Sequence, residues 1–243
     1  AQPIRSPQFL LGLSVLCACL GAERALLPHI RLRYVAVHDG LLAAVSPFRG
    51  LRSLDLAYTM ADNIDALSSC TNLHTLDLFC TSVTNISALS CCTELRFLNL
   101  SLTPVVDIRP VSSCKALHFL ELFNTRVECI SALSCCNALH TLNLHLTPVM
   151  DVGALSLCTA LHTLSLARTH VKDITALSAC TILHTLDLAA TAVADLTSLS
   201  SCTALHTLNS SETRVRDIAA LSSCVTLHTL DLSHTQVADI SIL

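Results

Sequence analysis

Leucines recur along the chain with a fixed spacing of 22 residues. The hexapeptide LHTLDL begins at residues 73, 183 and 227, and related hexapeptides begin at residues 51, 95, 117, 139, 161 and 205. When the first leucine of each copy is numbered position 1, leucine fills positions 1 and 4 in all nine copies. It fills position 6 in all but one, where Ser210 stands, and positions 11, 14 and 17 are also apolar. Such self-similarity predicts a solenoid in which every copy is one structural unit.

Each copy predicts a short strand, a turn and a short helical segment. The alternation of apolar and polar residues in TLDL and its relatives is typical of a strand with one buried face. Asn or Asp stands at position 13 in eight of the nine copies, directly before segments such as ISALSCC. These side chains are expected to act as helix N-caps, because they accept hydrogen bonds from free N–H groups. One unit cannot bury its apolar side alone, so stacked neighbours must share a continuous core.

The pattern L-x-x-L-x-L, followed by apolar positions 11, 14 and 17, resembles the leucine-rich repeat. The similarity is to the 22-residue class seen in internalins and in a nuclear protein-phosphatase regulator. It covers residues 29–243, with a weaker first copy expected to begin at His29 and to place Leu32 and Tyr34 at positions 4 and 6. The resemblance implies an α/β right-handed solenoid of about ten repeats, the last one incomplete. A parallel β-sheet would form its concave face, and short helical or 3-10 segments its convex face.

Position 9 departs from the family pattern. The family has asparagine there, whose amides form a ladder that satisfies backbone groups inside the turn, whereas this chain has threonine in all nine copies. A hydroxyl can donate once and accept, while the methyl group packs inward. We therefore expect a less polar version of the ladder.

Cysteine occupies position 20 in all eight copies that reach it, where the family has a leucine that points into the core. Since a buried thiol packs as a small hydrophobic group, we expect this column to fill space. Disulfides and a zinc site are the alternatives. Parallel side chains leave Cβ atoms about 5 Å apart, wider than the ~3.8 Å of a disulfide, and they do not converge as zinc ligands do. The column comprises Cys70, Cys92, Cys114, Cys136, Cys158, Cys180, Cys202 and Cys224.

Composition narrows the class of protein. The chain is 52% hydrophobic and 13% charged, yet no apolar run approaches the roughly 20 residues of a membrane span. A formal charge of −4 gives no electrostatic reason to expect nucleic-acid binding. Fourteen cysteines favour a reducing, intracellular compartment. Without a phosphate-binding loop, nucleophile elbow or metalloprotease motif, no enzyme activity, cofactor, metal site or small-molecule substrate is expected.

The two ends of the chain have special interpretations. Residues 1–28 do not fit the repeat, and they are either a capping helix or an export signal around FLLGLSVLCACLGA. The last copy stops at Leu243 without a polar terminal unit. Because solenoids generally need such a unit, further chain or a partner is expected to cover this end.

Departures from the consensus indicate where a partner binds. Phe97 and Phe119 replace threonine at position 3, on the predicted concave face, and other aromatic or leucine residues stand at positions 7 and 8, on its rim. Exposed aromatic residues are typical interface anchors, although ordinary packing against the rim is the alternative. The predicted binding surface comprises Tyr58, Phe79, Phe97, Leu102, Phe119, Phe123 and Leu146, with Arg52, Arg96 and Glu121 as its polar rim.

Histidine fills position 2 in seven copies. Duplication explains the repetition, so a solvated row without function is expected, with metal binding or pH sensing as alternatives. These residues are His74, His118, His140, His162, His184, His206 and His228.

The sequence thus predicts a non-catalytic interaction scaffold, either an adaptor or a structural subunit of a multi-subunit assembly. Its protein partner would bind the concave face of the N-terminal half. The alternative, implied by the resemblance to internalins, is a surface or secreted adhesion receptor.

Overall fold

Each 22-residue unit contributes one three-residue strand to a single parallel sheet. The computed structural model describes residues 28–35, 42 and 50–242, and within them ten strands pair in the order of the sequence. Like positions of neighbouring units lie opposite each other, as Leu142 and Leu164 do. The strands are β1 (His29–Arg31), β2 (Ser53–Asp55), β3 (Thr75–Asp77), β4 (Phe97–Asn99), β5 (Phe119–Glu121), β6 (Thr141–Asn143), β7 (Thr163–Ser165), β8 (Thr185–Asp187), β9 (Thr207–Asn209) and β10 (Thr229–Asp231).

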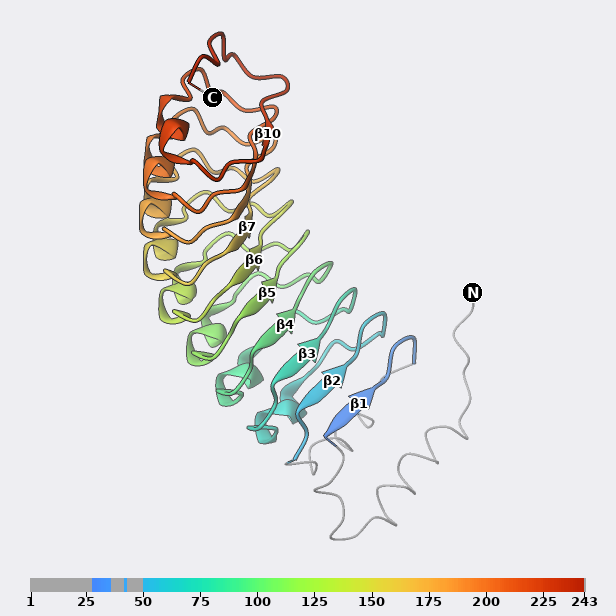
Figure 1. Cartoon of the computed structure of the whole chain (residues 1–243). Coiled ribbons are helices and arrows are strands. Elements are labelled where there is room, and N and C mark those ends of the chain that lie inside the picture. Colours follow the sequence, from blue (N-terminus) through green and yellow to red (C-terminus); the bar gives the residue numbers. More distant parts are fainter. Residues whose placement is uncertain (1–27, 36–41, 43–49, 243) are drawn as a thin grey trace, which may run out of the picture.

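A five-residue 3-10 segment follows the strand in each of the units that contain β2 to β9. Figure 1 shows these segments on the outer side of a curved stack and the strands on its inner side, which confirms the predicted solenoid. None of these segments has the length needed to cross a bilayer, nor does any other helix in the described part of the chain. They are η2 (Asp65–Ser69), η3 (Ser87–Cys91), η4 (Arg109–Ser113), η5 (Ser131–Cys135), η6 (Gly153–Leu157), η7 (Thr175–Ala179), η8 (Thr197–Ser201) and η9 (Ala219–Ser223).

The first unit is two residues longer than predicted. His29 pairs with Ser53, whereas a copy beginning at His29 with the common spacing would have paired Arg31 with that residue. The predicted register of this copy was therefore wrong. Leu32 lies at position 6 and is buried, while Tyr34 lies at position 8 and is 69% exposed. The proposed cap or signal, residues 1–28, falls almost wholly outside the described residues.

The core is a set of parallel columns that run the length of the stack. In the central units every apolar consensus position is at most 1% exposed. Burial of this extent stabilises by about 1.5–3 kcal/mol for each large aliphatic side chain. In the unit that contains β6, the core residues are Leu139, Leu142, Leu144, Val149, Val152, Leu155 and Cys158.

The cysteine column packs as predicted. Its eight members are at most 3% exposed and are free thiols. The thiol of Cys92 lies 3.7 Å from the carbonyl oxygens of both Leu67 and Cys70 in the preceding unit, and the column repeats this weak donation. Burial raises the pKa of Cys92, Cys114, Cys158 and Cys202 to about 12. A buried, protonated thiol is inert and serves packing.

The threonine at position 9 acts within its own unit. The hydroxyl of Thr147 donates to the carbonyl oxygen of Leu144 at 2.6 Å, and the same bond occurs in all nine copies. The expected ladder between units is therefore replaced by nine separate bonds, since the short side chain reaches the carbonyl three residues earlier in the same turn.

The residue before this threonine has a left-handed backbone in every unit, although none is glycine. Leu146, for example, has φ 58°, and its N–H donates to the carbonyl oxygen of Ala167 in the next unit at 3.0 Å. This conformation, which is sparsely populated by residues other than Gly, Asn and Asp, was not predicted. It allows the turn to close while still bonding to its neighbour.

The predicted N-caps lie one residue before the true N-cap position. In η8 the N-cap is Leu196, and no side chain caps the segment; position 13 instead forms a turn with the first helical residue. The side chain of Asp195 accepts a hydrogen bond from the N–H of Thr197, the first residue of η8, and the same bond recurs in all eight copies with Asn or Asp at position 13. Hydrogen bonds from the hydroxyl and N–H of Thr197 lower the pKa of Asp195. Cys129 occupies this position in the remaining unit.

Replacing Thr147 with valine should lower the free energy of unfolding by about 1 kcal/mol, because a nearly isosteric methyl group removes a buried hydrogen bond. Chemical denaturation measures this difference. Thr159→Val is the control, since Thr159 is exposed. Equal stabilities of the two variants would show that the hydroxyl at position 9 contributes nothing.

Candidate functional site

The predicted binding surface separates into two rows at the two ends of the strands. Phe97 on β4 and Phe119 on β5 form the concave pair. They lie opposite each other in the sheet, with ring centroids 6.4 Å apart. Phe119 is 42% exposed and Phe97 is half-buried, so both rings lie on the open face of the sheet and not in the core.

The second row lies on the rim, after the strands. Tyr58 and Phe79 meet edge to face with centroids 5.0 Å apart. Phe123 contacts the ring of His145 at 5.4 Å. Both phenylalanines are half-buried, whereas Tyr58 is 44% exposed. Leu102 is half-buried and Leu146 is exposed at the same edge of the solenoid.

Tyr34 extends this row and was missed by the sequence analysis. Its ring stacks on that of Tyr58 with centroids 4.8 Å apart and planes inclined by 14°. Tyr34, Tyr58 and Phe79 therefore form one rim cluster over three units. The two-residue error in the register of the first copy had assigned Tyr34 to a buried position. A repeat pattern anchored on the strand rather than on the first leucine would have found it.

The polar residues of the predicted surface differ in their surroundings. Arg52 and Arg96 are exposed and form no ion pair within the described residues. Glu121 is half-buried, and burial raises its pKa, an effect that a hydrogen bond from Asn143 partly offsets.

An ion-pair network that the sequence did not reveal lies beside the rim cluster. Arg33 binds Asp55 at 2.6 Å and Asp77 at 2.9 Å, and Arg31 lies 3.4 Å from Asp55. The two carboxylates occupy equivalent positions on paired strands. One guanidinium thus bridges two neighbouring carboxylates on the concave face.

Most polar side chains at position 5 accept a hydrogen bond from the backbone of the turn that follows. Asn143 accepts the N–H of His145 at 3.0 Å, and Asp187 accepts that of Ala189 at 3.1 Å. Seven of the nine position-5 side chains from Asp55 onward make this bond, which stabilises the turn that follows each strand.

Histidines form a stack in place of the expected solvated row. Adjacent rings from His140 to His206 lie 4.7 Å apart with planes inclined by 7–11°, and His228 continues the stack at 5.1 Å. These five residues are the histidine stack. Among the residues that the structure describes, no group of three His, Cys, Asp or Glu residues is arranged to hold a metal ion.

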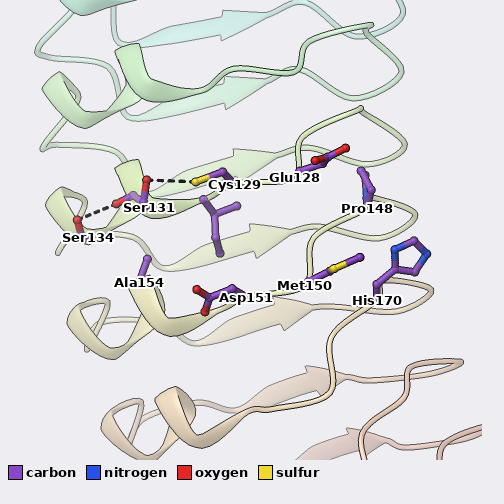
Figure 2. Close-up of a pocket in the computed structure, with 10 residues that line it drawn as sticks. Glu128, Cys129, Ser131, Ser134, Pro148, Met150, Asp151, Ala154 and His170 are labelled. Carbon is purple, nitrogen blue, oxygen red and sulfur yellow. Dashed lines mark hydrogen bonds between the residues drawn. The ribbon is translucent and has the colours of Figure 1, made fainter.

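A shallow hollow lies on the flank of the solenoid, away from the strands (Figure 2). Its volume is about 650 Å³, and its lining includes Cys129, Met150, Asp151 and His170. The thiol of Cys129 donates to Oγ of Ser131 at 3.3 Å. Hydrogen bonds from the side chain and backbone of Ser131 lower the pKa of this exposed thiol.

Comparisons with known proteins identify the fold. No family model and no curated protein matches the sequence, but solved structures do. An internalin (InlF) from Listeria monocytogenes superposes with a TM-score of 0.77 and 22% identity, over 100% of this chain and 79% of its own. Internalin C2 from the same species gives 0.71 and 23%, over 81% and 84%. The chain has the leucine-rich repeat fold.

A leucine-rich repeat solenoid of a second kind is also similar. The plant peptide hormone receptor RGFR1, solved in complex with RGF2, superposes with a TM-score of 0.67 and 18% identity, over 79% of this chain and 37% of its own. At these identities the similarity establishes the architecture of the repeats. The roles of the surface residues of this leucine-rich repeat chain are therefore inferred from the chemistry of those residues.

Thiol reactivity should separate the cysteines of this leucine-rich repeat solenoid into three groups. At about pH 8, Cys129 should be alkylated first because its pKa is lowered. The other exposed thiols, Cys80, Cys91 and Cys135, should follow. The buried column should react when the chain unfolds. Timed alkylation with peptide mass spectrometry measures the order, and fast labelling of Cys158 in the native protein would contradict it.

Proposed function

We propose that this leucine-rich repeat solenoid is a non-catalytic protein-interaction scaffold whose partner docks across the concave pair and the rim of the N-terminal half. The observation that carries the proposal is the pair Phe97 and Phe119. Its two rings lie against each other on the open face of a sheet, at a position that is otherwise threonine or serine from β2 to β10. Nothing in the core requires an aromatic residue there.

The energetics favour side-chain recognition at this surface. Within the sheet, backbone N–H and C=O groups are already bonded between units, so few of them remain for a partner. Aromatic side chains bury a large area and dominate many interfaces. Arg52 and Arg96 add exposed, unpaired positive charge close by, which can orient an acidic or polar partner segment.

Similar proteins support an interaction role. RGFR1, which has the same architecture, was solved in complex with RGF2, and two internalins superpose over most of the chain. The absence of a recognisable catalytic motif in the sequence agrees with this role. We propose that the scaffold serves as an adaptor or as a subunit of a larger assembly.

An intracellular location is part of the proposal, and an internalin-like surface receptor is the second candidate. All twelve cysteines in the described part of the chain are free thiols, which suits a reducing compartment. The likeness to internalins favours the second candidate. Counting free thiols in protein purified from its native source distinguishes them, since oxidation of the four exposed thiols would support the receptor.

Replacing both Phe97 and Phe119 with threonine should reduce capture of the partner by at least about tenfold, because aromatic anchors commonly contribute more than 1.4 kcal/mol. Stability should stay unchanged, since threonine is the common residue at this position. Affinity purification with the native chain as bait, followed by titration of the captured protein, measures the effect.

Met150→Thr is the matched control for this experiment. Met150 is 66% exposed and apolar but lies on the flank, away from the strands. Undiminished capture by the double phenylalanine variant, or an equal loss with the control, would remove the concave pair from the binding site.

A further inference from the structure

The histidine stack is a linear array of rings that each have one nitrogen, Nε2, without a hydrogen-bond partner among the described residues. In His140, His162, His184 and His206, Nδ1 lies 3.2–3.4 Å from the hydroxyl of the threonine that follows. No hydrogen bond to Nε2 of these rings occurs within residues 50–242. Because neighbouring rings are parallel and 4.7 Å apart, the Nε2 atoms repeat at the spacing of the strands.

The charged neighbours of the stack are few. The three residues before each histidine, at positions 21, 22 and 1, are uncharged from β6 to β10, and so are the threonines that follow. The 3-10 segments η5 to η9 contain no Asp, Glu, Lys or Arg. Facing groups on the strands are Glu121 on β5, Asp187 on β8 and Asp231 on β10, all at position 5. In the two units before the stack, position 2 is occupied by His118 and Arg96.

The parallel arrangement of the rings opposes simultaneous protonation of neighbouring histidines. Protonated rings 4.7 Å apart repel each other, so each proton makes the next one harder to add. Burial, and then the charges of His140 and His184, lower the pKa of His162. A lowered pKa favours the neutral ring, so charging requires a pH below the usual value of roughly 6.5.

We propose that the histidine stack is a binding strip for a carboxylate-rich peptide segment, engaged in mildly acidic conditions. Charge complementarity supports this occupant. Mild acid is the range in which an imidazole can gain a proton, while aspartate and glutamate of the peptide stay ionised down to about pH 4.5. A carboxylate held between two rings accepts from both Nε2–H groups and relieves their repulsion.

The charge of the whole chain changes in the same direction. The formal charge is −4 with 12 neutral histidines and the isoelectric point is about 6.3, so acidification through this range reverses the sign of the protein. The stack concentrates five of these histidines on one face. The proposal goes beyond the partner surface of the N-terminal half and uses different residues.

Binding of a fluorescein-labelled octaglutamate peptide, followed by fluorescence anisotropy, tests the strip. Affinity at about pH 5.5 should exceed that at about pH 7.5 by at least tenfold. The variant with His162→Asn and His184→Asn should lose most of the gain at the lower pH. Binding should also take up protons, because the peptide stabilises the charged rings.

Matched controls are available in the same chain. His74 and His118 occupy the same position on other units, and each places Nδ1 2.6 Å from a backbone carbonyl oxygen, outside the stack. The variant with both of these changed to asparagine should retain the gain. So should the variant with Phe97→Thr and Phe119→Thr, which separates this result from the proposed partner surface.

Several outcomes would contradict the proposal that the histidine stack is a binding strip. These are equal affinity at the two pH values, no binding at the lower pH, an equal loss in the His74 and His118 control, or equal binding of an octaglutamine peptide. Tighter binding of an oligonucleotide of equal charge would replace the peptide with a nucleic acid. Circular dichroism checks that the variants fold, and His184→Asn alone serves if the double variant does not.

Discussion

Parallel pairing in register is the constraint on which the structure depends. Like positions of successive units lie opposite each other at the spacing of paired strands. A residue type that recurs at one position of the repeat therefore lies next to its own kind in the structure. An apolar residue then stacks on its own kind, as Leu142 does on Leu164. A charged residue would face a like charge, which is unfavourable. The low charge of the chain, 13%, agrees with this rule.

The acidic residues of the sheet illustrate the same rule. Position 5 carries carboxylates on several strands, yet from β2 to β10 the only acidic residues on adjacent strands are Asp55 and Asp77. This pair is the one that Arg33 binds at 2.6 and 2.9 Å. Elsewhere asparagine or serine separates the carboxylates, as Asn143 and Ser165 separate Glu121 from Asp187. On these strands, the adjacent pair of carboxylates is the one that has a counter-charge.

Sequence periodicity predicted which positions face the core, including the thiol column, because burial depends on the repeat alone. It did not predict the bond from Thr147 to Leu144 or the left-handed backbone of Leu146, which depend on the closure of each turn. Departures from the consensus located Phe97 and Phe119. They did not show that the rim aromatics form a separate row, or that Tyr34 belongs to it, since the first copy has few leucines and was aligned two residues out of register.

The same geometry gives opposite properties to columns inside and outside the solenoid. Inside, repetition of a thiol yields inert packing, because burial raises the pKa of residues such as Cys158 and keeps them neutral. Outside, repetition of an imidazole yields a stack of parallel rings on the surface, as His162 and His184 show. The two kinds of surface column meet where the ring of Phe119 contacts that of His140 at 5.9 Å. A partner that covers Phe119 would therefore also reach the first ring of the histidine stack.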